Sequence, residues 1–390
     1  AGTWEIAVRT EQLAALLAGL GLPETAANGS GKFSFKPDTN AIAASGDLQG
    51  QVTQLQKLSP ALEAIGAVQF KTTFDGGVAG NLARLEKLEL EVTGPNGSKL
   101  AQISSLQRVD YSLVDQKVTL AKPGTEVARI ALHEVPLAWA QSMAKPMIIE
   151  SGTLSLVLAI EAEPDGSRIR ARAPEPLALR NVTLRDAQKK ALLEKVTLTT
   201  RPSIDYSATK IVAQLADLSV SMPSGDSLSG TISADVTQLA STPSTAFAAQ
   251  LRAKVVTALK PYFPVETGPL AVEITAEGRH QGDILTLTKS STTVNREGGG
   301  LLTAQELLQT LSVDLKKTTV TAQNPTAAAA RLRLGEIPLA WAEPFVANSK
   351  FGGNVTGGTL EISLRSVDDV TLTTTAPVTL KGVSATMEGK

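Results

Sequence analysis

The sequence predicts a mainly β protein with a few short helices, in which two tandem repeats of about 200 residues are built from antiparallel strands. Three observations lead to this fold class: a long duplicated segment, alternating apolar and polar residues along most of the chain, and turn-forming residues between the alternating runs. The same observations leave a second arrangement open, in which each repeat closes as a β-sandwich-like domain.

One segment of the chain occurs twice. ARIALHEVPLAWA occupies Ala128–Ala140, and ARLRLGEIPLAWA occupies Ala330–Ala342, which is 202 positions later. The same offset relates positions far upstream, such as Phe70 and Val272. A register kept over so long a stretch indicates the duplication of a whole structural unit rather than a shared local motif.

The duplication sets the predicted domain organisation. Repeat unit one covers residues 1–181, and repeat unit two covers residues 182–382. Residues 383–390 correspond to the segment that follows Val182 in the first unit, so we expect the start of a further unit and a longer natural protein.

Alternation with a period of two predicts strands that have one apolar face and one wet face. In the clearest runs, leucine, isoleucine and valine occupy every second position, with charged or hydroxyl residues between them. Because few helices are predicted to cover so many strands, these apolar positions are candidates for the lining of a groove. The candidate lining residues are Leu88, Leu90, Val92, Leu154, Leu156, Leu158, Ile160, Leu360, Ile362 and Leu364.

Turn residues and a few helical patterns interrupt the strands. Helices are predicted over Thr10–Gly19, after Ser59-Pro60 and over Ser244–Leu259, with a capping box from Thr303 to Glu306 opening another. The predicted turns are Pro95-Asn96-Gly97, Pro164-Asp165-Gly166, Asp75-Gly76-Gly77 and Gly298-Gly299-Gly300.

Composition excludes several classes of function. Lys and Arg number 37 against 38 Asp and Glu, so the net charge of −1 and the lack of a basic cluster argue against nucleic-acid binding. The chain has no cysteine, which excludes disulfides, zinc–thiolate sites and thiol nucleophiles. No apolar run is long enough for a transmembrane helix.

Catalytic and metal-binding groups are scarce. The two histidines are His133 and His280, and the second unit has Gly335 where the first has His133, so we interpret both as solvent-facing turn residues. The segment Asn28–Lys32 resembles a phosphate-binding loop but is followed by Phe33 instead of Ser or Thr, so we interpret it as a turn. We predict no catalytic residue, no cofactor and no metal, and consider an enzyme the least favoured class.

The repeated Pro-Leu-Ala-Trp element is the strongest motif. It contains Pro136 and Trp139 in the first unit, and Pro338 and Trp341 in the second. We expect a short helix at a corner in each copy, where the proline ends a strand and a buried tryptophan packs against the end of the apolar face. Contact of the tryptophans with a ligand or with a neighbouring unit is the alternative.

Degenerate strand patterns give the chain a resemblance to a known family. Residues Val92–Ala121 and Val182–Thr200 each read as a strand, a polar turn and a further small-apolar and alternating strand, and Gly353–Leu360 (GNVTGGTL) with Ser151–Leu154 (SGTL) gives a glycine-rich strand start. In these patterns the chain resembles the AsmA/TamB-like family of bacterial envelope proteins. The Pro-Leu-Ala-Trp element and the segment Ser244–Leu259 are not matched by that family's patterns.

The resemblance implies that the two repeats form an elongated, twisted sheet or groove of the β-taco kind. Its continuous aliphatic inner face would conduct phospholipid chains across the periplasm. The resemblance also implies a periplasmic or cell-envelope location, a part in outer-membrane biogenesis, and a longer membrane-anchored protein of which this chain is a portion. The expected partners are a phospholipid or another acyl-chain lipid, and neighbouring repeat units or envelope proteins. An acyl chain gains about 0.8 kcal/mol per buried methylene, so such a face needs no specific polar site.

Two other classes of protein stay open. A structural or adhesive surface protein made of stacked β-repeats fits the same strands, with each unit closing its own core. An enzyme would require an enclosed polar pocket with a carboxylate of shifted pKa.

Overall fold

The fold is built almost entirely from strands. The computed structural model describes residues 1–10, 23–57, 60–142, 144–260, 265–346, 348–366 and 369–387. The protein is 68% strand and 6% helix, which confirms the mainly β prediction. Among the described residues, no helix has the length and apolar character needed to cross a membrane. The chain divides into two compact units, Ala1–Ala208 and Thr209–Lys390.

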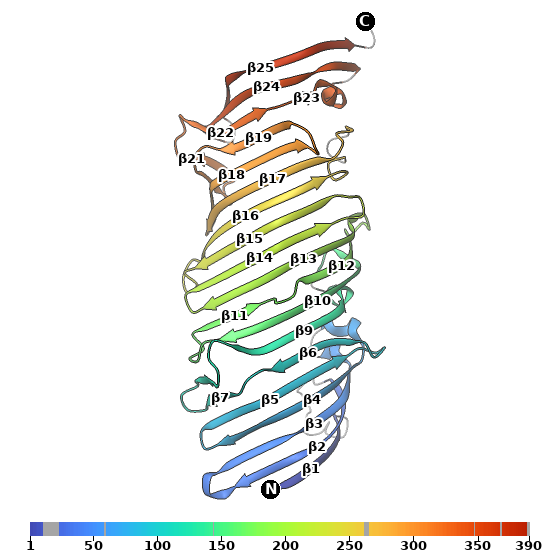
Figure 1. Ribbon diagram of the computed structural model, residues 1–390, viewed down its shortest axis with the longest axis vertical. Coiled ribbons are helices and arrows are strands. Elements are labelled where there is room, and N and C mark those ends of the chain that lie inside the picture. Colours follow the sequence, from blue (N-terminus) through green and yellow to red (C-terminus); the bar gives the residue numbers. More distant parts are fainter. Residues whose placement is uncertain are drawn as a thin grey trace. The chain divides into compact units, whose positions relative to one another are not determined.

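Unit 1 contains thirteen strands and four 3-10 helices in its described part (Figure 1). The strands are β1 (Gly2–Arg9), β2 (Glu24–Lys36), β3 (Ala41–Thr53), β4 (Val68–Ala79), β5 (Leu82–Thr93), β6 (Lys99–Ser105), β7 (Val109–Ser112), β8 (Val118–Leu120), β9 (Glu126–Pro136), β10 (Ile148–Ala162), β11 (Arg168–Arg172), β12 (Leu177–Arg185) and β13 (Ala191–Ser207). The 3-10 helices are η2 (Pro37–Thr39), η3 (Leu55–Lys57), η4 (Pro60–Ile65) and η5 (Leu137–Ala140).

Unit 2 contains twelve strands and one 3-10 helix among its described residues. The elements are β14 (Lys210–Ser221), β15 (Ser227–Thr237), β16 (Ser244–Val255), β17 (Leu270–Gln281), β18 (Ile284–Arg296), β19 (Leu301–Leu307), β20 (Leu311–Asp314), β21 (Thr319–Ala322), β22 (Ala328–Leu334), β23 (Ile337–Pro338), η6 (Leu339–Phe345), β24 (Ser349–Leu364) and β25 (Val370–Met387).

Both units follow the same antiparallel strand order. In unit 1, β5 pairs with β4 along one edge and with β6 and β7 along the other, and β6 continues to β9 and then to β10. In unit 2, β18 pairs with β17, β19 and β20, and β19 continues to β22 and β24. The strands β4 and β17 begin at Val68 and Leu270, and β6 and β19 begin at Lys99 and Leu301, 202 positions apart in each case. The boundary between repeats at residues 181 and 182 stays a prediction.

Each unit has its strands in one sheet. The substantial contacts of each described strand are with its hydrogen-bonded neighbours and with the 3-10 helices η5 and η6, and no second layer of described strands packs across either face. The alternative of two β-sandwich-like domains is therefore wrong, because a sandwich requires two facing sheets in each domain.

Two predicted helices are strands in the structure. The segment predicted as a helix over Ser244–Leu259 forms β16, and its residues from Ser244 to Lys254 pair with both β15 and β17. The segment predicted to follow a capping box forms β19, where Glu306 bonds to Arg331 of β22 instead of capping a helix. Pairing with neighbouring strands overrides the local helical pattern in both segments. The helix predicted after Ser59 is the 3-10 helix η4, and the one predicted over Thr10–Gly19 lies, beyond Thr10, outside the described residues.

Several predicted turns are also strand interiors. Asp75-Gly76-Gly77 lies within β4 beside a bulge, and the hairpin turns three residues later, at Gly80 and Asn81. The segment Asn28–Lys32 is the middle of β2, paired on both sides. His133 and His280 are half-buried residues of β9 and β17, so their interpretation as solvent-facing turn residues is wrong. The turns at Pro95-Asn96-Gly97, Pro164-Asp165-Gly166 and Gly298-Gly299-Gly300 are confirmed.

Glycines in β2 and β3 make room for the first tryptophan. The rings of Trp4 in β1 and Phe74 in β4 stack with centroids 6.1 Å apart, although two strands separate them. The indole crosses those strands above Gly31 and Gly46, where an added Cβ would lie 2.6 Å and 2.4 Å from the Trp4 ring. The glycine-rich sequence that resembles a phosphate loop therefore has a packing role.

We predict that Gly46→Ala lowers the stability of unit 1. The added methyl group would collide with the Trp4 ring and with the carbonyl oxygen of Ser30, and overpacking of this kind costs about 2–3 kcal/mol. Urea unfolding followed by tryptophan fluorescence measures the loss. Gly357→Ala, in a strand with open space at its Cβ, is the control and should change the midpoint little. Equal midpoints for the two variants would contradict the packing role.

A buried aspartate holds the loop that follows β16. The carboxylate of Asp226 accepts hydrogen bonds from the amides of Val256 at 2.6 Å and Thr257 at 3.0 Å, and from the hydroxyls of Ser224 and Thr257, both at 2.6 Å. Burial alone would raise the pKa of Asp226, but these hydrogen bonds outweigh it and hold the pKa well below its usual range.

We predict that Asp226→Asn removes about 2 kcal/mol of stability at pH 7, because buried donors lose a charged acceptor. A depressed folded-state pKa stabilises the protein above the unfolded value of about 4, and this contribution is lost as the pH falls below it. The gap between wild type and variant in urea unfolding should therefore shrink between pH 7 and pH 3. Asp283→Asn, at an exposed position, is the control. A gap that is independent of pH would argue against an ionised Asp226.

Candidate functional site

One face of the unit 1 sheet is apolar. Strand pairing places apolar or small residues of eight successive strands side by side, in rows that run across the sheet. One row contains Ile6, Gly29, Leu48, Thr72, Leu90, Ile103, Ile130 and Leu158. The next row contains Val8, Ala27, Gly50, Phe70, Val92, Ala101, Leu132 and Leu156. Figure 1 shows these strands in order from β1 to β10.

The predicted lining residues fall on these faces. Leu88, Leu90 and Val92 lie in β5, and the structure brings them into register, through β6 and β9, with the predicted residues of β10. The residues of β10 are Leu154, Leu156, Leu158 and Ile160. Leu360, Ile362 and Leu364 lie in β24 of unit 2, beside β22 and β25. All ten side chains are half-buried. That they line a groove stays a prediction.

The apolar face has no deep core beneath it. Among the described residues, no large side chain is fully buried, and the buried apolar residues include many alanines. Large apolar residues toward the strand ends stay open to solvent: Phe35 is 51% exposed and Ile42 is 54% exposed. A face this extensive and this accessible is typical of surfaces that bind a partner.

The repeated corner motif forms one short 3-10 helix in each unit. Pro136 and Pro338 end β9 and β23, and η5 and η6 follow directly. Trp139 and Trp341 are half-buried rather than buried as predicted. The guanidinium of Arg296 lies over the ring of Trp341, 5.7 Å from its centroid.

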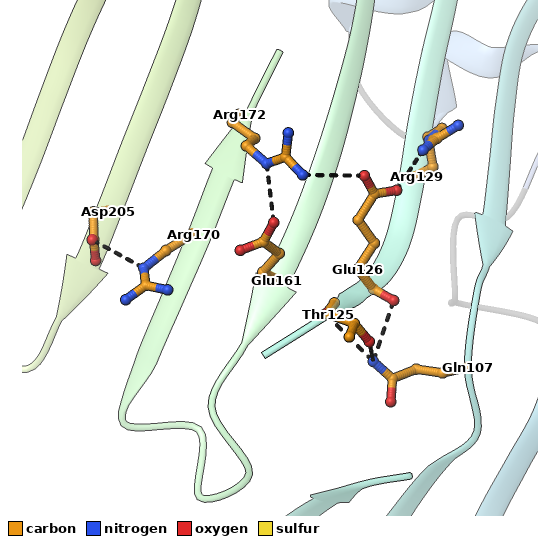
Figure 2. Close-up of polar contacts among 8 residues, drawn as sticks. All are labelled: Gln107, Thr125, Glu126, Arg129, Glu161, Arg170, Arg172 and Asp205. Carbon is orange, nitrogen blue, oxygen red and sulfur yellow. Dashed lines mark hydrogen bonds and ion pairs between the residues drawn. The ribbon is translucent and has the colours of Figure 1, made fainter. Parts of the chain in front are cut away.

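The opposite face carries charged residues that pair across strands (Figure 2). Arg172 of β11 bonds to Glu161 of β10 at 3.0 Å and to Glu126 of β9 at 3.4 Å, and Glu126 also binds Arg129. On the other side of β11, Arg168 and Arg170 bind Asp205 of β13. The hydrogen bonds from Arg168 are the main reason that the pKa of Asp205 lies below its usual value.

A glutamine in each unit fastens the loop before β9 and β22. The Nε2 atom of Gln107 donates to the carbonyl of Lys122 at 3.0 Å, and its Oε1 accepts from the Lys122 amide at 2.6 Å (Figure 2 shows its further contacts with Thr125 and Glu126). Gln309, 202 positions later, binds the carbonyl and amide of Asn324 at 2.9 Å and 2.6 Å. These contacts fasten the loops that precede β9 and β22 beside the strand pairs β6–β9 and β19–β22.

The structure offers little chemistry beyond this. Within the described residues, no cluster of three His, Asp or Glu side chains could hold a metal ion. Among the described residues, no carboxylate is hydrogen-bonded to His133 of β9 or to His280 of β17. No family model, no curated protein and no solved structure matches the chain.

Sequence reasoning missed the polar residues in the region where β18 pairs with β19, which we call the β18–β19 seam. It assigned Thr303 and Glu306 to a helix, and it did not single out Arg296. A position-by-position comparison at the offset of 202 would have found them, since Thr292 and Gln305 stand where the first unit has Leu90 and Ile103.

We predict that the charged face stabilises the fold only weakly where it is exposed. The side chain of Arg172 is 51% exposed, so Arg172→Gln should cost under about 1 kcal/mol, and less at high salt. The side chain of Asp110 is 11% exposed and accepts a bond from Arg84 at 2.8 Å, so Asp110→Asn should cost about 3 kcal/mol. Urea unfolding at low and high salt measures both. A larger loss for Arg172→Gln than for Asp110→Asn would overturn this ranking.

Proposed function

We propose that this chain is a non-enzymatic lipid-binding or lipid-conducting protein whose apolar sheet face holds acyl chains. The observation that carries the proposal is the set of rows of apolar and small residues in unit 1, which cross eight strands without a described second layer above them. Water next to such a face is unfavourable by about 25 cal/mol per Å² of apolar surface, so a hydrocarbon cover is favoured.

The shape of the rows suits an acyl chain. Neighbouring residues of a row lie about 5 Å apart, the spacing of adjacent strands, so a row forms a path perpendicular to the strands. Along the row from Leu90 through Ile103 and Ile130 to Leu158, the side chains are all aliphatic and half-buried. No single position offers a stronger contact than the next, which is a condition for sliding as well as for binding.

The charged face of the same sheet supports this assignment. The ion pairs around Arg172 and Asp205 keep that face in water, so only the apolar face is available to lipid. A location in the bacterial envelope and partners among envelope proteins rest on the resemblance to AsmA/TamB-like proteins alone.

A matched pair of double variants tests the proposal. Ile130 and Leu158 are cross-strand neighbours on the apolar face, and Ala131 and Val157 are cross-strand neighbours on the opposite face of the same two strands. We expect Ile130→Gln with Leu158→Gln to reduce the lipid that co-purifies with the protein severalfold, because polar groups interrupt the apolar row. Ala131→Gln with Val157→Gln should leave the bound lipid unchanged.

Bound lipid is measured by native mass spectrometry and by organic extraction of protein purified in mild detergent and incubated with phospholipid vesicles. Circular dichroism and urea unfolding establish that each variant is folded. A wild-type protein that carries no lipid after incubation would contradict the proposal. Equal loss of bound lipid in the two double variants would also contradict it.

A further inference from the structure

In unit 2, polar residues replace apolar ones on the apolar face at the β18–β19 seam. Thr292 pairs with Gln305 there, at the register position where Leu90 pairs with Ile103 in unit 1. The four inward positions Leu88, Leu90, Ala101 and Ile103 of unit 1 correspond, 202 residues on, to Ser290, Thr292, Thr303 and Gln305. A hydrocarbon-lined surface in one unit is therefore lined by hydroxyl and amide groups in the other.

A single cation lies at the end of this polar seam. Arg296 pairs with Leu270, two residues beyond the pairing of Val294 with Val272, so strand alternation puts its side chain on the same face as both valines. The corresponding residue of unit 1 is Gly94. The duplicated scaffold thus carries an arginine at this place in one unit only.

The environment of Arg296 leaves its charge without a counterion. Its Nε atom is buried and has no hydrogen-bond partner, and the indole of Trp341 covers the guanidinium at 5.7 Å. The adjacent Glu297 binds Lys254 at 2.6 Å instead. No described carboxylate forms an ion pair with Arg296. A guanidinium without a carboxylate partner can bind an anionic ligand through its remaining N–H groups.

We propose that Arg296 and the β18–β19 seam bind the phosphate of a phospholipid head group, while its acyl chains lie on the neighbouring apolar face. A guanidinium offers a planar fork of donors that fits two phosphate oxygens, and a ring stacked on one side leaves that fork free at its edge. Thr292 and Gln305 supply further donors along the seam for the glycerol and head-group oxygens. This inference rests on the proposed lipid-binding function and adds to it a polar site that binds the head group.

A phospholipid fits this seam better than a free phosphate ion does. Arg296 is the cation that faces the site among the described residues, and beside it in the sheet are Val272, Val294 and the buried Leu270. Free phosphate would gain a single charge-assisted contact and nothing from those apolar groups, whereas a phospholipid engages both.

A competition experiment tests the inference on the full chain. The protein is incubated with mixed detergent micelles that contain equal amounts of phosphatidylglycerol and a diacylglycerol with the same acyl chains, and native mass spectrometry gives the ratio of the two bound lipids. We expect Arg296→Gln to lower this ratio about tenfold, the scale of one lost charge-assisted contact. Arg296→Lys should retain part of the preference, and Thr292→Leu with Gln305→Ile, which restores the residues of unit 1, should lower it.

Arg252→Gln is the matched control. Arg252 lies on the opposite face, next in sequence to the inward-facing Leu251, with a side chain that is 79% exposed and paired with Glu273. It should leave the ratio unchanged. Circular dichroism shows whether each variant is folded.

The outcomes separate the inference from the function on which it rests. If Arg296→Gln still binds both lipids and the ratio of bound phosphatidylglycerol to diacylglycerol is unchanged, the head-group site is overturned but the lipid-binding proposal is not. Failure of the wild type to bind either lipid would overturn both. Glycerol phosphate added as a free competitor should not displace phosphatidylglycerol at equal concentration, and displacement would show that the seam recognises a soluble phosphate instead.

Discussion

Pairing between neighbouring strands is the interaction on which the rest of this structure depends. In a protein with two packed layers, side chains from facing elements fill a shared core, but here the described strands make their contacts with the strands beside them. Cross-strand pairs such as Leu90 with Ile103 and Ile130 with Leu158 therefore supply the packing within the sheet. A slip of one residue in any pair would move apolar side chains to the charged face, so the alternation must hold from strand to strand.

That constraint explains why the two faces are so different. One face carries the cross-strand ion pairs of Arg172 and Asp205, whose charged groups are well hydrated. The other face carries aliphatic residues that stay half-buried. Glycines are accepted inside strands where they serve this packing, as beneath Trp4, despite their usual cost in a sheet. The proposed lipid-binding role follows from the same constraint, because a single layer leaves its apolar face to be covered by something else.

Much of this could be predicted from the sequence, because strand alternation has a period of two and is visible without tertiary information. The strands β5, β10 and β24, with apolar residues at alternate positions, were predicted in this way, as was the antiparallel strand architecture. The helix predicted over Ser244–Leu259 failed because alanine-rich sequence satisfies a helical stripe and a strand face equally well, and pairing with β15 and β17 decides between them. The stacking of Trp4 on Phe74 and the position of Arg296 over Trp341 could not be predicted, since both join segments that only the folded register brings together.

The central claim is that the apolar face, and not the charged face, is covered by lipid. The chain has no cysteine, so a single spin label can be placed on either face by Leu90→Cys or by Glu89→Cys, adjacent residues of β5 that point to opposite sides. Accessibility of each label to a water-soluble paramagnetic reagent is measured before and after incubation with phospholipid. The account predicts that lipid protects the label at position 90 and leaves the label at position 89 accessible. Equal accessibility of both labels in the presence of lipid would contradict it.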